Sequence, residues 1–232
     1  MNILAIETAT ESCSVALQCG DDVQHRFTHQ PQQQAKLVLP MVDELMAEAD
    51  LRPAQLDAVA FGRGPGSFTG LRIAAAVTQA IAFAHDLPVA AVSTLAILAQ
   101  TAYRTQTVSS VLAAIDARMQ EVYWGVYQLN DDGLMSLHGE EQVVAPSAVT
   151  INGLGDVAWL GVGSGWRAYS EKLCQRLNTV QVTVLEDCWP HAQDMLCFAQ
   201  EYIGGGKTIA AEKVEPVYIR NKVAKSLAER GK

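Results

Sequence analysis

The apolar positions along the chain alternate between short runs and longer stretches with helical spacing. Short apolar runs that stop at glycine, acidic or turn residues are typical of buried strands, and apolar residues three and four apart are typical of helices. In the first half, these patterns predict strands over residues 3–6, 13–17, 23–28, 58–61 and 89–92, and helices over 33–49, 68–85 and 94–103.

The second half of the chain repeats this order of patterns. They predict strands over residues 111–115, 122–129, 134–144, 157–160 and 180–185, a short helix from 146, and helices over 166–177 and 191–203. The duplicated order βββαβα is that of an α/β fold with two ribonuclease-H-like lobes around a cleft, as in actin-like ATPases and sugar kinases. We expect an N-terminal lobe over 1–104 and a C-terminal lobe with a basic tail over 105–232.

Composition narrows the class of protein. With 232 residues, 49% hydrophobic and 18% charged, the chain is expected to fold around a large core. Its net charge of -8 excludes a strongly basic nucleic-acid clamp. Glu7 interrupts the first apolar run too early for a signal peptide, and no apolar stretch is long enough to cross a membrane. Five cysteines without a C-x-x-C pair predict reduced thiols and a cytoplasmic protein.

A glycine-rich segment joins the predicted strand 58–61 to the helix 68–85. Its spacing does not match G-x-G-x-x-G, which would need glycine at Ser67 or Thr69, and it lacks the Gly-Lys-Ser/Thr of a P-loop. A phosphate cradle at the helix N-terminus stays open, but a tight turn with Ser67 or Thr69 as the helix cap is favoured. The predicted structural loop consists of Gly62, Gly64, Pro65, Gly66, Ser67 and Gly70.

Two carboxylates are candidates for chemistry. Glu7 and Asp116 each end the first strand of a lobe, where a two-lobed ATPase handles magnesium or water. A capping or turn role is an equal alternative. The histidines offer no comparable set, because His25 and His29 on one predicted strand would lie about 13 Å apart. A peptidase would also lack an identifiable nucleophile, base and metal set.

The predicted helix 33–49 has an unusually wide apolar arc, wider than packing on one sheet requires. Two interpretations stay open: one side packs on the sheet while the other docks a partner, or the helix is sandwiched within its own lobe. The apolar rows consist of Leu37, Val38, Met41, Val42, Leu45, Met46 and Ala49.

Four segments together resemble the TsaB, or YeaZ, family, and the resemblance covers nearly the whole chain. These segments are residues 3–10, 62–72, 115–123 and 215–220. The resemblance implies a bacterial subunit of the tRNA threonylcarbamoyladenosine machinery. That machinery transfers a threonylcarbamoyl group to the adenosine 3' of the anticodon in tRNAs that read ANN codons. The family is also classed with M22 peptidases, here without peptidase residues.

The family resembles TsaD, the catalytic subunit, and this chain departs from TsaD at two places. The metal-binding histidines of TsaD fall at Thr94 and Leu98, which cannot replace imidazole. The glycine-containing phosphate loop of its second lobe falls at residues 116–119, which contain no glycine. We therefore expect no catalytic, metal-binding or cofactor-binding residue, and ATP or ADP only at the interface of a complex.

By the same resemblance, the expected role is a non-catalytic activating subunit. Its partners would be TsaD in a heterodimer, the ATPase TsaE, and a second copy in a homodimer, with tRNA reached only through the complex. The alternative is a free-standing ATPase or kinase that uses Glu7 and Asp116, and an interaction module unrelated to tRNA stays open as well. The predicted partner interface consists of Leu37, Val38, Met41, Val42, Leu45, Met46, Leu71 and Ala75.

Overall fold

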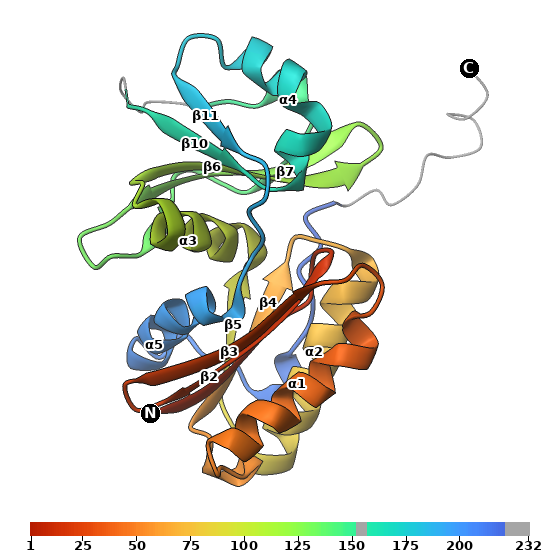
Figure 1. Cartoon of the computed structure of the whole chain (residues 1–232), viewed down its shortest axis with the longest axis vertical. Coiled ribbons are helices and arrows are strands. Elements are labelled where there is room, and N and C mark those ends of the chain that lie inside the picture. Colours follow the sequence, from red (N-terminus) through yellow and green to blue (C-terminus); the bar gives the residue numbers. More distant parts are fainter. Residues whose placement is uncertain (152–156, 221–232) are drawn as a thin grey trace, which may run out of the picture.

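The computed structural model describes residues 1–151 and 157–220, which form two lobes, each built on one β-sheet (Figure 1). The first sheet has the strand order β3-β2-β1-β4-β5. Strands β1 and β2 are antiparallel, whereas β4 and β5 run parallel to β1. Its strands are β1 (Asn2–Glu7), β2 (Ser12–Cys19), β3 (Asp22–His29), β4 (Ala58–Gly64) and β5 (Val89–Ser93).

The second sheet has the order β11-β10-β6-β7-β8, and β9 pairs with β7. Its antiparallel pair β6–β7 and parallel strands β10 and β11 reproduce the arrangement of the first sheet, which confirms the predicted duplicated α/β fold. Its strands are β6 (Ser110–Arg118), β7 (Glu121–Leu129), β8 (Met135–Leu137), β9 (Gln142–Val144), β10 (Trp159–Val162) and β11 (Val182–Leu185).

Helices cover both faces of each sheet, because strand residues alternate between two apolar cores. Leu4 of β1 faces α1 and α2, whereas Ile3 faces a central core shared by both lobes. Trp166 of α4 closes the outer core of the second sheet. The helices are α1 (Gln34–Glu48), α2 (Phe68–His85), α3 (Thr94–Gln106), α4 (Ser164–Arg176) and α5 (Leu196–Gly204).

One helix from each half of the chain packs on the sheet of the other lobe. Helix α3 follows the last strand of the first sheet, yet it packs mainly on β6, β7 and β8, between the two sheets (Figure 1). Helix α5 follows the second sheet and packs on β5, β1 and β4 of the first. The expected lobe boundary after residue 104 falls near the end of α3. The central core therefore combines residues from both halves of the chain.

Four predicted elements differ in detail. The strand expected over 134–144 is two short strands, because Gly139 adopts a positive φ of 83° between them. The helix expected from 146 is only a 3-10 turn, Pro146–Ala148, and the helix expected from 191 begins with one, Ala192–Met195. Strand β10 continues through Gly161, which lies against the Trp166 ring where a Cβ would come within 2.5 Å. A further 3-10 turn each covers Pro53–Gln55 and Ala211–Lys213.

None of the helices within the described ranges has the length and apolarity that crossing a bilayer would need.

Candidate functional site

The glycine loop between β4 and α2 packs on the end of β1. Ser67 caps α2 as predicted, since its Oγ accepts the Gly70 N–H at 3.1 Å. The Ser67 N–H donates to the Ala9 carbonyl at 2.7 Å, and the Thr8 hydroxyl donates to the Gly70 carbonyl at 2.7 Å. A Cβ on Gly70 would lie 2.0 Å from the Thr8 carbonyl oxygen. These glycines allow close contact between two backbone segments, which is the structural role expected from the sequence.

Glu7 lies directly beneath this loop. A Cβ on Gly62 would meet the Glu7 Oε2 at 1.9 Å, so glycine makes room for the carboxyl. The Glu7 side chain accepts the Ala9 N–H at 2.6 Å and the Thr94 hydroxyl at 3.5 Å, and it is fully buried. Burial raises the pKa of Glu7 to about 7, against the lowering effect of these two hydrogen bonds. The carboxyl is therefore enclosed rather than presented to a cleft.

The middle of the loop contacts the C-terminal part of the chain. Gly64 has a φ of 114°, which favours glycine, and its peptide bond to Pro65 is cis. A Cβ at Gly64 would come within 2.9 Å of the Val217 carbonyl oxygen. Gly66 approaches Ala9 in the same way, with its Cβ position 2.4 Å from the Ala9 carbonyl oxygen. The loop is thus filled on both sides by protein.

Asp116, at the equivalent end of β6, is held by its own neighbours. Its carboxylate accepts the Arg118 N–H at 2.9 Å, pairs with the Arg118 guanidinium at 3.1 Å and accepts the Tyr169 hydroxyl at 3.3 Å. Arg118, Met119 and Gln120 all have positive φ, between 56° and 63°. Side chains therefore occupy a turn whose backbone conformation favours glycine. The residues present do not fit a glycine-lined phosphate loop here, and Glu7, the other candidate carboxyl, is enclosed.

The positions that would correspond to metal ligands are also filled. Thr94 is fully buried with its hydroxyl on Glu7, and Leu98 belongs to the central core. Ser93, which caps α3, donates to the Glu141 carboxylate, and Tyr127 donates to the same oxygen at 2.6 Å. Among the described residues, no group of three or more His, Cys, Asp or Glu side chains could hold a metal ion. The side chains at positions 94 and 98 therefore do not fit a metal site.

Most of the predicted partner interface lies inside the first lobe. Val38, Val42, Leu45 and Met46 are at most 6% exposed and pack on the sheet. The wide apolar arc of α1 is explained by packing on β2 and α2 together, which is the sandwiched alternative. Among the other predicted interface residues, Leu37 and Met41 are half-buried at the edge of the same core, whereas Leu71 and Ala75 are buried.

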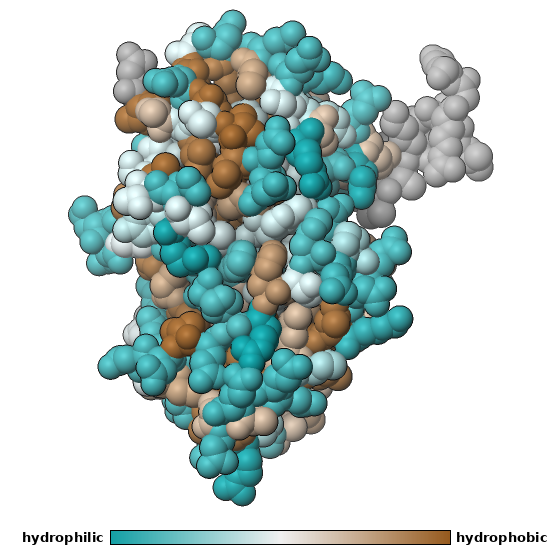
Figure 2. All heavy atoms as spheres, viewed as in Figure 1, coloured by the Kyte–Doolittle hydropathy of each residue, from teal (hydrophilic) through white to brown (hydrophobic). Residues whose placement is uncertain are grey.

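The apolar side chains that α1 and α2 expose differ from the predicted interface residues. The large apolar side chains exposed on these helices are Leu39 on α1, at 50%, and Phe68 and Phe83 on α2, at 54% and 66%. Ala76, Ala80 and Ala84 are exposed along α2 at intervals of four residues, so its outer side is apolar and flat. On the face in view in Figure 2, the first lobe shows only separate apolar residues among hydrophilic ones. Sequence periodicity identified the helix but could not distinguish its inner from its outer side.

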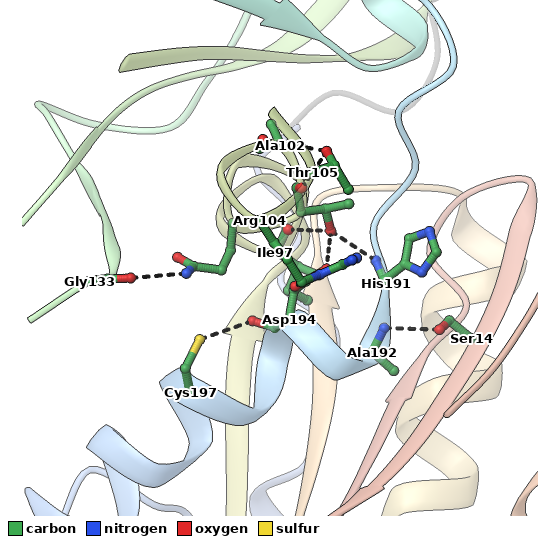
Figure 3. A network of polar contacts seen from close by, with 12 residues as sticks. Ser14, Ile97, Ala102, Arg104, Thr105, Gly133, His191, Ala192, Asp194 and Cys197 are labelled. Atoms are coloured by element: carbon green, nitrogen blue, oxygen red, sulfur yellow. Dashed lines mark hydrogen bonds and ion pairs between the residues drawn. The ribbon is translucent and has the colours of Figure 1, made fainter. Parts of the chain in front are cut away.

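A polar network between the lobes was not predicted from the sequence (Figure 3). Asp194, 5% exposed, accepts two hydrogen bonds from the Arg104 guanidinium at 2.6 and 2.9 Å and one from the Thr101 hydroxyl at 2.7 Å. The Ala192 N–H donates to the Ser14 hydroxyl at 2.9 Å. These hydrogen bonds connect α3 to the turn before α5. No local sequence pattern predicts contacts between residues 90 positions apart.

A family model and curated relatives match most of this two-lobed chain. Residues 29–227 match the family model described as TsaD, tRNA N6-adenosine threonylcarbamoyltransferase. The TsaB protein of Escherichia coli K12, a "tRNA threonylcarbamoyladenosine biosynthesis protein", is 42% identical over 230 residues, covering 97% of this chain and 96% of its own. Its Haemophilus influenzae counterpart is 40% identical, with 96% and 95% covered.

A solved structure of the same family also superposes on this chain. The solved structure of YeaZ from Pseudomonas aeruginosa superposes with a TM-score of 0.87 at 46% identity, covering 94% of this chain and 99% of that one. The chain belongs to the TsaB (YeaZ) family.

Proposed function

We propose that this chain is a non-catalytic subunit of bacterial tRNA threonylcarbamoyladenosine biosynthesis, which binds and stabilises TsaD. In this role it supports transfer of the threonylcarbamoyl group to the adenosine 3' of the anticodon in tRNAs that read ANN codons. Family membership supports the pathway, since the relatives from E. coli and H. influenzae carry that name. Location in the cytoplasm belongs to the same proposal.

The observation that carries the docking role is a set of exposed apolar residues on two helices, Leu39 on α1 and Ala76, Ala80, Phe83 and Ala84 on α2. Leu39 and Phe83 are large apolar side chains that are at least half exposed, on two helices that pack against each other. Covering such side chains contributes roughly 25 cal/mol per Å² before the entropic costs of association. A homodimer through the same exposed side chains when TsaD is absent belongs to the same proposal, since exposed apolar side chains favour any complementary cover.

The non-catalytic role is supported by the way reactive positions are filled. Glu7 is enclosed, Asp116 is paired with Arg118, and Leu98 packs in the core. A nucleotide is accordingly proposed only at the interface with TsaD. Contact with TsaE and with tRNA is proposed to occur through the complex. Lys222, Lys225, Arg230 and Lys232 of the basic tail lie outside the described residues.

The test is pairing with purified TsaD, measured by size-exclusion chromatography with light scattering. The native chain is expected to form a stable heterodimer, and Phe83→Glu combined with Leu39→Glu is expected to abolish it. Glu171→Lys, an exposed change on α4 of the other lobe, is the matched control and should pair normally. If TsaD and the native chain elute independently, the docking role is refuted. If the double variant still pairs, the outer side of α1 and α2 is not the interface.

A further inference from the structure

Residues 214–220 run from the first lobe to the second. The segment leaves the first lobe at the 3-10 turn Ala211–Lys213, which is fixed to α2 because the Gln79 amide donates to the Ala211 carbonyl at 3.0 Å. From there it passes between the lobes on the side where α2 begins (Figure 1). Its path joins the glycine loop of one lobe to the β6–β7 turn of the other.

The first-lobe attachment involves both backbone and side chains. The Val217 N–H donates to the Arg63 carbonyl at 2.8 Å. The Arg72 Nε donates to the Tyr218 hydroxyl at 3.3 Å, and the Tyr218 ring lies 5.9 Å from the ring of Phe68. Arg72 also stacks on Phe68, with its guanidinium carbon 3.6 Å from the ring centroid. Two residues of the segment are therefore bound to the loop and the first turn of α2.

The second-lobe attachment is Arg220. Its guanidinium pairs with the Glu121 carboxylate and lies 3.1 Å from the Met119 sulfur and 3.5 Å from the Arg118 carbonyl oxygen. The Arg220 side chain is only 14% exposed, which is low for an arginine near the end of a segment. Because Arg118, Met119 and Gln120 hold left-handed backbone conformations, the turn presents one defined shape to this guanidinium.

We propose that residues 214–220 act as a clamp that fixes the angle between the two lobes. Other contacts join the lobes elsewhere, and two of them are ion pairs. Arg104 of α3 holds Asp194, and Arg167 of α4 pairs with Glu11 after β1 at 3.1 Å. Links at separate places oppose hinge opening more effectively than one, since a single contact leaves a rotation axis free. In this chain the lobes keep one relative orientation, and the clamp is the link made by its C-terminal segment.

The test measures the distance between the lobes in the full chain by double electron–electron resonance. One spin label goes on Cys174, the exposed cysteine of α4, and the other on Lys36→Cys, on the exposed side of α1. Cys19→Ser removes one of the partly exposed thiols, and burial raises the pKa of the Cys13, Cys188 and Cys197 thiols to about 12, which suppresses their labelling.

The expected result is one narrow distance distribution for the labelled chain and a broader, shifted one for Arg220→Ala. Arg26→Ala is the matched control, because it removes an arginine that pairs with Glu44 and Glu48 within the first lobe. The exchanged pair Arg220→Glu with Glu121→Arg should restore the narrow distribution. Equal distributions for Arg220→Ala and Arg26→Ala would overturn the clamp. A distribution that the exchanged pair leaves broad would show that the ion pair is not its closing contact.

Discussion

At the scale of single residues, Glu7 shows how surroundings decide what a carboxyl can do. Its position at the end of β1 is that of a cleft-facing acid, yet Gly62 lies so close that the side chain is sealed under the loop. A buried carboxyl without a cationic partner is costly to ionise. The buried Glu7 carboxyl therefore links the stability of the fold to pH.

The Glu7→Gln variant is expected to remove a pH dependence of stability. Burial raises the pKa of Glu7 from 4.5 in the unfolded chain to about 7 in the folded one, so the free energy of unfolding falls as pH rises through this interval. At pH 8 the glutamine variant should be more stable by up to about 3 kcal/mol, and near pH 4 the advantage should vanish. Urea unfolding at both pH values checks this, with the exposed Glu171→Gln as control. Parallel pH profiles for the native chain and Glu7→Gln would contradict it.

The glycines of the loop offer a second test at this scale. Gly70→Ala places a Cβ 2.0 Å from the Thr8 carbonyl oxygen, a backbone atom that cannot move aside, so we expect a loss of about 3 kcal/mol or more. Gly204→Ala, in the last turn of α5, meets no atom within 4 Å and should be neutral or stabilise by up to about 1 kcal/mol. Thermal unfolding compares the two. Similar melting temperatures would show that the loop is not closely packed on β1.

At the scale of elements, α1 separates what periodicity reveals from what it hides. The helix was predicted within one residue at each end, because its apolar spacing depends only on local geometry. Which side faces the core depends on β2 and α2, which a helical pattern does not contain. The residues chosen as partner contacts were therefore mostly core residues, and Leu39, next to Pro40 and outside both apolar rows, was missed.

Alanine substitutions of two leucines on this helix are therefore expected to affect different properties, folding stability and association. Leu45→Ala removes a fully buried side chain and is expected to cost about 3 kcal/mol of folding stability. Leu39→Ala, at a position 50% exposed, should change stability by less than about 0.5 kcal/mol while weakening any association through the outer side of α1. Denaturant unfolding and a concentration series of light scattering separate the two effects. A large stability loss for Leu39→Ala would contradict this division of α1.

The same contrast holds for the other elements. Helix α2 and most strands were predicted closely, since capping by Ser67 and short apolar runs are local signals. The break at Gly139 and the passage of β10 through Gly161 were not, because one reflects a left-handed residue and the other a contact with Trp166. The candidate site was predictable where a residue's neighbours in sequence decide its role, as for Ser67. It was not where partners come from the other lobe, as for Asp194.

At the scale of the whole molecule, the lobes are joined by polar links as well as by a common core. The Asp194 carboxylate is nearly fully buried, and Arg104 is its cationic partner. Removing one member of such a pair leaves the other charge without compensation.

Arg104→Ala is therefore expected to lower the free energy of unfolding by about 2 kcal/mol, more than an exposed ion pair is worth. Arg26→Ala, whose partners are half exposed, should cost less than Arg104→Ala. Urea unfolding of both variants at neutral pH makes the comparison, and adding Asp194→Asn to Arg104→Ala should recover part of the loss. Equal costs for the two arginine variants would show that the interlobe network adds little to stability.

The crossing of α3 and α5 between the lobes has a consequence for dividing the polypeptide. A fragment ending after α3 would carry a helix whose main contacts, with β6, β7 and β8, belong to the missing half. The complementary fragment would carry α5 without the sheet that α5 covers. Each fragment alone would expose an apolar surface and tend to aggregate. Two fragments produced together in one cell would carry complementary halves of a single core and can reassemble.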